Sequence, residues 1–143
     1  MGQIYSLTYR EAEKIMAAAV HTLETQFKSA AVTLVNRDGT EIASIAMDGV
    51  RPFTIYVAAL KARQAAWVGK PTDETWKQII SGELTAEIIG IEPEMLVPWA
   101  GGMPIYDNEN HLIGGIGVSN LKQEEDAMVA ENAVHKAGFR VRI

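Results

Sequence analysis

Apolar and polar positions follow two different periods along the chain, and the changes of period divide it into helices and strands. Apolar residues recur at helical spacing between about residues 8 and 28, where Thr8 and Glu11 form the Thr-x-x-Glu pattern of a capping box. Two β-branched, apolar runs follow at 30–35 and 41–47, separated by an Asp-Gly turn. An Asp-Gly turn between such runs predicts an antiparallel hairpin.

The middle of the chain returns to helical spacing and is rich in alanine. A helix is expected over 54–68, ended by Gly69 and Pro71, and a shorter one over 72–80. The first helix has one narrow face of mainly small residues: Ile55, Ala58, Ala59, Ala62, Ala65 and Ala66. Such a face lets a helix sit close to a sheet or to another helix.

Residues 81–100 are broken repeatedly by glycine and proline, and they predict a long excursion with one helical turn near 84–88. Excursions of this length in a compact domain are often functional. Packing against a neighbouring molecule explains the segment equally well.

The stretch 101–120 predicts a second hairpin, with its tip at 107–110, leading directly into a helix. Its second apolar run alternates glycine with isoleucine or valine, which marks a place where a packed helix or a ligand approaches the backbone closely. Asn120 with Gln123 predicts the cap of the following helix. Alternation over 139–143 predicts a fifth strand. The element order indicates one α+β domain over residues 1–143, built around a single sheet.

Composition narrows the possible functions. The 143 residues include no cysteine, which excludes disulfides, thiolate catalysis and zinc–sulfur sites. A net charge of −5 argues against a nucleic-acid partner, because phosphate binding needs a basic surface. No apolar run is long enough to span a membrane. The first seven residues lack the pattern of a signal peptide, so a cytoplasmic location is expected.

Three polar residues mark the block that joins the second strand to the alanine-rich helix: Asp48, Lys61 and Arg63. A lysine there can hold a carboxylate or phosphate as a point charge. A buried lysine with a lowered pKa can act as a base or nucleophile. The favoured interpretation is structural, with Lys61 paired to Asp48 or to a carboxylate of a neighbouring subunit.

Ser119 lies where a strand meets a helix, so its hydroxyl either caps the helix or binds an anion, and capping is favoured. His21 lies beside the apolar face of the first helix, where a half-exposed side chain without a role is the favoured interpretation. The three histidines, at 21, 111 and 135, lack metal-ligand spacing, so no metal site is expected.

Three sequence blocks, taken together, resemble the GlcG/HbpS family, which also forms the C-terminal domain of PduO proteins and is often labelled a heme-degrading domain. The blocks are Met47-Asp48-Gly49 with Lys61-Ala62-Arg63, then Gly69-Lys70-Pro71-Thr72, then Gly101-Gly102-Met103-Pro104-Ile105 with Gly115-Ile116-Gly117-Val118-Ser119 and Glu124-Glu125-Asp126. The resemblance implies a profilin-like sheet of five antiparallel strands with helices on both faces. It also implies homo-oligomers, often octamers, and heme as a possible cofactor.

The chain departs from the family pattern at three positions, with Ala46 in place of arginine, Gln64 in place of threonine and Asn120 in place of glycine. The family's arginine and threonine lie where ligand or partner subunits are thought to bind.

Three functions follow from the residues and the resemblance. The first is an oligomeric small-ligand-binding protein, for heme or another tetrapyrrole, with His21 of a neighbouring subunit as an axial ligand. The second is an enzyme, or an accessory protein of one, acting on a small hydroxy acid or other carboxylate. The third is a ligand-free assembly protein whose alanine-rich helix packs subunits. The candidate ligand-binding residues are Asp48, Lys61, Arg63, Gly101, Gly102, Ser119 and His21.

Overall fold

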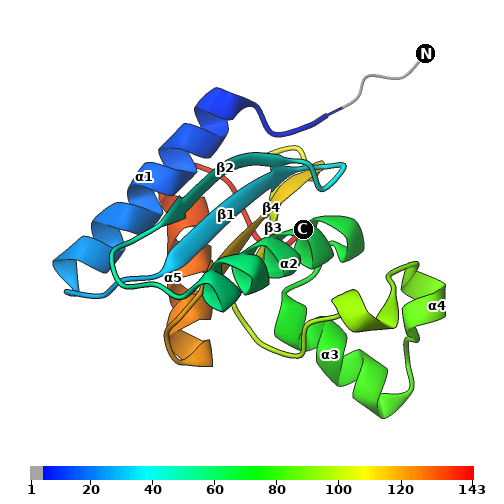
Figure 1. Cartoon of the computed structure of the whole chain (residues 1–143). Helices are drawn as coiled ribbons and strands as arrows, with labels where there is room; N and C mark the ends of the chain where they lie inside the picture. Colours follow the sequence, from blue (N-terminus) through cyan, green and yellow to red (C-terminus); the bar gives the residue numbers. More distant parts are fainter. Residues whose placement is uncertain (1–4) are drawn as a thin grey trace.

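A computed structural model describes residues 5–143. Residues 1–4, which belong to the N-terminal segment that lacks a signal-peptide pattern, lie outside the described residues. The chain forms a sheet with helices on both faces (Figure 1). Its elements are α1 (Tyr9–Thr25), β1 (Ala31–Asn36), β2 (Glu41–Ala46), α2 (Pro52–Val68), α3 (Thr72–Ser81), α4 (Ala86–Ile89), the 3₁₀ turn η1 (Pro93–Met95), β3 (Gly102–Tyr106), β4 (Leu112–Ser119) and α5 (Gln123–Lys136). The capping box at the start of α1 is confirmed, since Thr8 and Glu11 bond each other's backbone N–H.

Four antiparallel strands form the sheet in the order β2-β1-β4-β3, so the two predicted hairpins meet through their β1 and β4 strands. The prediction of a fifth strand is wrong for the described residues. The C-terminal segment makes only one isolated bridge, in which Arg140 and Tyr106 exchange backbone hydrogen bonds of 2.7 and 2.9 Å. Tyr106 is the last residue of the five-residue β3. The C-terminal segment therefore meets β3 at its end, where no further β3 residue is left to pair with it.

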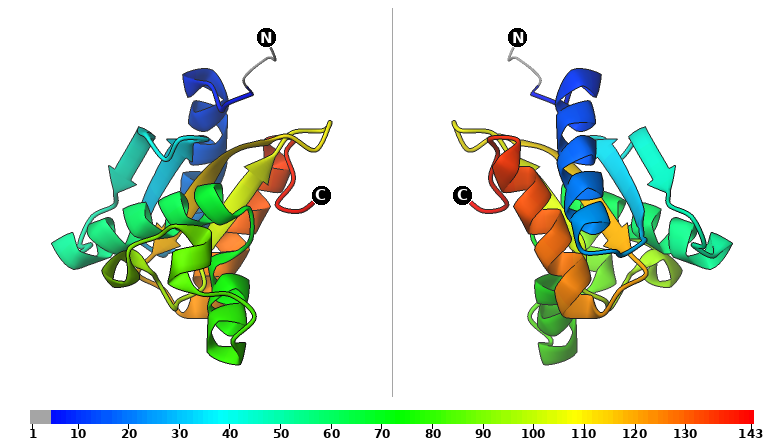
Figure 2. Two further views of the ribbon diagram at one scale, coloured as in Figure 1. Left: turned by 90° about the vertical axis from the view of Figure 1, so that its right-hand side faces the viewer. Right: turned by 90° about the vertical axis from the view of Figure 1, so that its left-hand side faces the viewer.

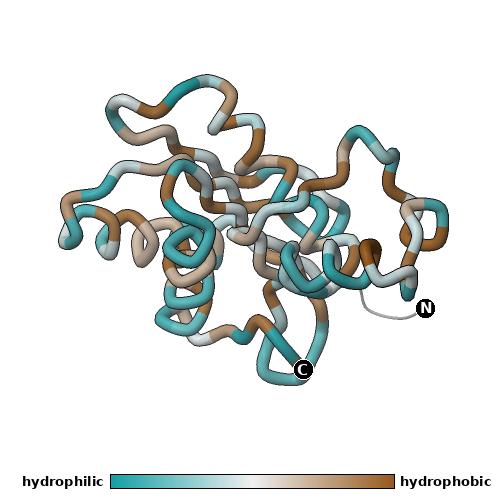
Figure 3. The backbone as a smooth tube through the Cα atoms, turned by 90° about the horizontal axis from the view of Figure 1, so that it is seen from below, coloured by the Kyte–Doolittle hydropathy of each residue, from teal (hydrophilic) through white to brown (hydrophobic). Residues whose placement is uncertain are grey.

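The two faces of the sheet carry different helices. Helices α1 and α5 cover one face, and α2 crosses the other, as the two side views in Figure 2 show. The main core lies between the sheet and the α1–α5 pair, where residues such as Ile15, Leu34, Ile116 and Val134 have no exposed surface. In Figure 3 the helical coils are striped with hydrophilic and hydrophobic residues, as expected of helices that bury one face.

Helix α2 packs backbone to backbone against β4. A Cβ atom added to Gly117 would lie 2.0 Å from the carbonyl oxygen of Ala58, and one added to Gly115 would lie 2.4 Å from that of Ala62. The close approach predicted from the glycine pattern is therefore made by a helix. Ala58 and Ala62 are fully buried within the chain, so these two alanines are not free to pack subunits, as the hypothesis of a ligand-free assembly protein required.

The excursion predicted over 81–100 starts at residue 82, because α3 extends to Ser81, and two buried polar side chains tie it to the domain. The amide oxygen of Gln64 accepts the N–H of Val97 at 2.8 Å. Thr72 donates to the carbonyl of Trp99 at 2.7 Å and accepts the N–H of Gly102 at 3.1 Å. The expected helical turn is present as α4. Gln64 thus has a structural role in this chain.

Candidate functional site

A cavity of about 560 Å³ opens where the start of α2, the end of β4 and the start of α5 meet. We call it the β4–α5 cavity. Its apolar wall includes Phe53, Val57 and Leu121, and its polar lining includes Arg51, Ser119 and Gln123. Lys61 and Asp126 lie at its inner wall.

Lys61 is almost completely buried, with 2% of its surface exposed. Its ammonium group donates to the carbonyl of Val118 at 2.9 Å and to the carboxylate of Asp126 at 3.2 Å. The other carboxylate oxygen of Asp126 accepts the N–H of Leu121 at 3.1 Å. The pair therefore joins α2, the end of β4 and the first turns of α5.

The prediction that Lys61 pairs with Asp48 or with another subunit is wrong, because its partner is Asp126 of the same chain. Asp48 is exposed in the turn that follows β2. Lys61 lies in the middle of α2 and faces the sheet, so its side chain reaches the β4–α5 junction. Asp126 could have been found from the sequence, since it falls at helical spacing with the buried Ala130 and Ala133.

Burial shifts the pKa values of both members of this pair toward their neutral forms. Loss of water lowers the pKa of Lys61, and the nearby Asp126 carboxylate only partly opposes the shift. Loss of water also raises the pKa of Asp126, against the opposing effect of Lys61 and of backbone N–H groups. Each group consequently needs the other to stay charged.

Gly101 and Gly102 shape the backbone around Lys61. Gly101 has a φ of +121°, and a Cβ atom there would lie 2.8 Å from the Lys61 ammonium nitrogen. A Cβ atom on Gly102 would lie 2.5 Å from the Lys61 carbonyl oxygen. Neither glycine lines the cavity. These positions are required for packing around the buried lysine.

The start of α5 differs from its prediction. The N-cap residue is Lys122, with no side-chain capping bond, so neither Ser119 nor Asn120 caps the helix. Asn120 instead has a φ of +124° and donates its amide to the carbonyl of Ser29 at 2.8 Å, while Ser119 lines the cavity. Helix α2 also begins without a side-chain cap, at Arg51.

These uncapped helix starts make the cavity favourable for anions. Residues from the first turns of both α2 and α5 line it, and helix N-termini carry a partial positive charge. Lys61 and Asp126 neutralise each other, so the unpaired charge of the lining is that of Arg51, and Glu124 and Glu125 of the first turn of α5 lie outside the lining. Arg51 and Gln123, which the sequence analysis missed, are therefore part of the candidate site.

The remaining predicted site residues lie elsewhere. Arg63 is half-buried on α2 and His21 is exposed on α1, and neither lines the cavity. His111 stacks on Tyr5 with ring centroids 3.6 Å apart and bonds the carboxylate of Asp107 at 2.8 Å. Of the predicted ligand-binding residues, only Lys61 and Ser119 come together at the cavity.

No group of three or more histidine, aspartate or glutamate side chains within residues 5–143 is arranged to hold a metal ion. Among the described helices, none is both long and apolar enough to cross a lipid bilayer.

A family model described as haem-degrading protein, HbpS-like, matches residues 7–135. The chain belongs to this HbpS-like family. It is 27% identical over 141 residues to the corrinoid adenosyltransferase PduO of Citrobacter freundii, covering 96% of this chain but only 40% of the length of that relative.

Solved structures confirm the HbpS-like fold. A PduOC:heme complex superposes with a TM-score of 0.85 at 22% identity, covering 96% of this chain and 99% of that one. A double mutant of HbpS from Streptomyces reticuli superposes with a TM-score of 0.80 at 26% identity, covering 95% and 90%. One of the proteins that share this fold, PduOC, was therefore crystallised with heme.

Proposed function

We propose that this protein binds a ligand through a carboxylate group at the β4–α5 cavity, that heme is the first such ligand to test, and that the protein acts as a homo-oligomer. The observation that supports this proposal most directly is the cavity itself, which combines a positive rim with an apolar wall. The heme complex of the PduO C-terminal relative supports the choice of heme.

The residues of the cavity suit the edge of a tetrapyrrole. Arg51 is exposed at the rim, where its planar guanidinium can bind a propionate in a bidentate manner. Phe53, Val57 and Leu121 offer an apolar wall for the ring. Lys61 and Asp126 hold the inner wall in place.

The cavity does not fit the iron of heme equally well. Its lining includes no histidine, methionine or tyrosine. His21 is exposed on α1, so in this proposal it reaches the iron only from a neighbouring copy. The proposed function is therefore binding of heme and not its degradation.

The test is a heme titration of the purified protein followed by absorbance, with particle size measured on the same sample. We expect saturable binding, weakened about tenfold in Arg51→Gln, which corresponds to about 1.4 kcal/mol. Arg37→Gln, at the exposed β1–β2 turn, is the matched control and should bind as the parent does. Absence of a Soret shift, or equal binding by Arg51→Gln, would refute the proposal for heme.

A free small carboxylate, such as a hydroxy acid, is the second candidate ligand. A small carboxylate needs no iron-binding side chain, so the lack of histidine, methionine and tyrosine in the lining favours it over heme. The hydrogen-bonding side chains of Ser119, Asn120 and Gln123 around the cavity also favour a small carboxylate. Glycolate or lactate should then raise the melting temperature relative to chloride at equal ionic strength. This protection should disappear in Arg51→Gln, and no protection of the parent protein would exclude this ligand class.

A further inference from the structure

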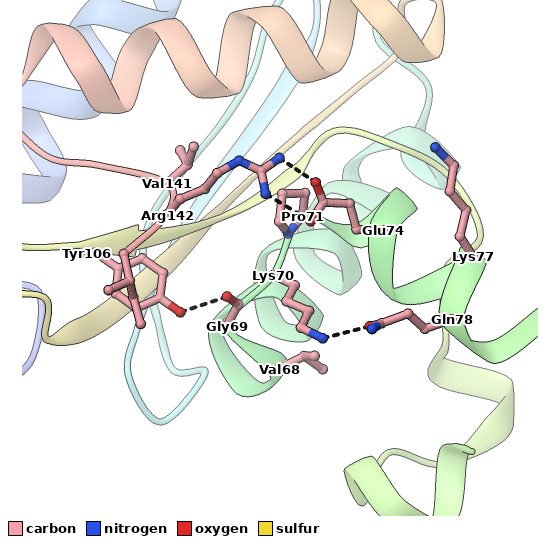
Figure 4. A pocket seen from close by; sticks show the side chains of 11 residues that line it. Val68, Gly69, Lys70, Pro71, Glu74, Lys77, Gln78, Tyr106, Val141 and Arg142 are labelled. Atoms are coloured by element: carbon pink, nitrogen blue, oxygen red, sulfur yellow. Dashed lines mark hydrogen bonds and ion pairs between the residues drawn. The ribbon is translucent and has the colours of Figure 1, made fainter. Parts of the chain in front are cut away.

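A second cavity, of about 530 Å³, lies at the other end of α2, where the chain turns into α3 (Figure 4). We call it the α2–α3 cavity. Helix α2, which has 17 residues and is about 26 Å long at 1.5 Å per residue, runs from the first site to the second. The two cavities share no lining residue.

The backbone of this cavity is fixed by a tyrosine. The hydroxyl of Tyr106, at the end of β3, donates to the carbonyl of Gly69 at 2.7 Å. Gly69 ends α2 with a φ of +80°, and a Cβ atom there would lie 2.7 Å from the same hydroxyl. The α2–α3 turn is consequently held against the sheet in one conformation.

Positive side chains predominate in the lining, although the whole protein has a net charge of −5. Lys70, Lys77 and Arg142 line the cavity together with one acidic side chain, that of Glu74 (Figure 4). The guanidinium of Arg142 bonds both oxygens of Glu74, one of them at 3.0 Å. Glu74 is therefore already neutralised by Arg142.

The two lysines keep their charge uncompensated within the cavity. Lys70 donates to the neutral amide oxygen of Gln78 at 2.7 Å. Lys77 is exposed and forms no salt bridge within the described part of the chain. The hydrogen bond from Arg142 lowers the pKa of Glu74, and the charges of both lysines add to this effect.

The acidic side chains nearby do not enter the lining. Asp73 and Glu131 act on Arg142, and Glu83 accepts the amide of Gln78 at 3.4 Å. The lining beneath the charges is apolar and is made by Val68, Pro71, Val141, Ile143 and the ring of Tyr106. The cavity therefore has an apolar floor and two cations without a salt-bridge partner among the described residues, Lys70 beside Gln78 and Lys77 on the other side of Glu74 (Figure 4).

We infer that the α2–α3 cavity is a second ligand site, which binds an oxyanion, phosphate or carboxylate, carried on a short apolar body. The charges of Lys70 and Lys77 attract the oxyanion to this lining, since an ammonium group is a suitable point charge for either kind. The floor between Pro71 and Val141 packs against the apolar body. This site does not depend on the function proposed for the β4–α5 cavity.

The experiment is calorimetric titration of the purified protein with four probes at constant ionic strength: phenyl phosphate, benzoate, inorganic phosphate and the neutral benzyl alcohol. We expect saturable binding of phenyl phosphate or benzoate, and the tighter of the two identifies the oxyanion. Inorganic phosphate should bind more weakly because it lacks the apolar body. Benzyl alcohol should not bind measurably.

Variants assign the binding to this cavity. Lys70→Gln with Lys77→Gln should weaken binding at least tenfold, whereas Lys14→Gln, an exposed lysine of α1, should leave it unchanged. Arg51→Gln should also leave it unchanged, which separates this site from the β4–α5 cavity. The inference is overturned if neither aromatic anion binds, if the double variant binds as the parent does, or if benzyl alcohol or inorganic phosphate binds as tightly as the aromatic anions.

Discussion

Removing the charge of Asp126 should reveal how much the domain depends on its buried ion pair. The substitution Asp126→Asn keeps the shape of the side chain and an oxygen that can still accept the N–H of Leu121. It leaves Lys61, which is 2% exposed, without a counter-charge. Breaking one partner of a buried pair costs about 3–5 kcal/mol of unfolding free energy.

The loss of unfolding free energy in Asp126→Asn has an upper limit that depends on pH. The reason is that Lys61 can lose its proton instead of remaining charged and unpaired. Keeping a lysine neutral costs about 1.36 kcal/mol for each pH unit below its ordinary pKa of about 10.4, which is about 4.6 kcal/mol at pH 7 and about 1.9 kcal/mol at pH 9. Burial lowers the pKa of Lys61 in the folded state, so the unfolded state binds more protons. The stability of the variant relative to the parent must therefore rise as the pH rises toward the unfolded pKa.

Urea denaturation followed by circular dichroism at pH 7 and pH 9 measures both effects. We expect Asp126→Asn to lose about 3–4.6 kcal/mol at pH 7 and less than about 2 kcal/mol at pH 9. Adding Lys61→Met should recover part of the loss at pH 7, because it removes the unpaired charge. Asp48→Asn, an exposed aspartate, is the control and should change stability by less than about 0.5 kcal/mol. A loss below about 1 kcal/mol at pH 7, or a loss that does not depend on pH, would refute the reasoning.

Two further substitutions test the packing and the excursion. Gly117→Ala should destabilise the protein by more than about 3 kcal/mol in urea denaturation, because the new methyl group meets a carbonyl oxygen of α2 at 2.0 Å. Gly49→Ala, with a φ of +85° but open space around it, should cost only about 1–2 kcal/mol, and equal losses for the two would argue against the clash. Gln64→Ala should remove the bond to Val97 and make the excursion more susceptible to a glutamate-specific protease, whereas Gln26→Ala, at the exposed end of α1, should not. Unchanged cleavage in Gln64→Ala would show that this bond does not hold the excursion.

Local signals predicted the elements of the fold correctly where the partners lie close in sequence. The capping box needs only Thr8 and Glu11, three residues apart, and both of its bonds are present. The glycine alternation in β4 predicted a close approach. It left the choice between helix and ligand open, because the approaching Ala58 is distant in sequence.

The predictions that were wrong depend on distant partners. Asn120 fits the pattern of a helix cap, but its side chain bonds Ser29, 91 residues away. Asp126, the partner of Lys61, is 65 residues away, and the nearer Asp48 was an equally good partner by residue type. The alternation at 139–143 is typical of a strand. It does not show whether a neighbouring strand has unpaired residues to bond with, and β3 offers only Tyr106, its last residue.

The contact between α2 and β4 has a mechanical consequence for both proposed sites. Where a carbonyl of the helix faces a glycine of the strand, no side-chain rotamer lies between them to absorb a displacement. The helix and the sheet must therefore move together as one rigid body. The two cavities lie toward opposite ends of α2 in that body. The distance between the two cavities is consequently fixed by the fold. A ligand bound in one cavity cannot move that cavity toward the other without breaking the contact between α2 and β4.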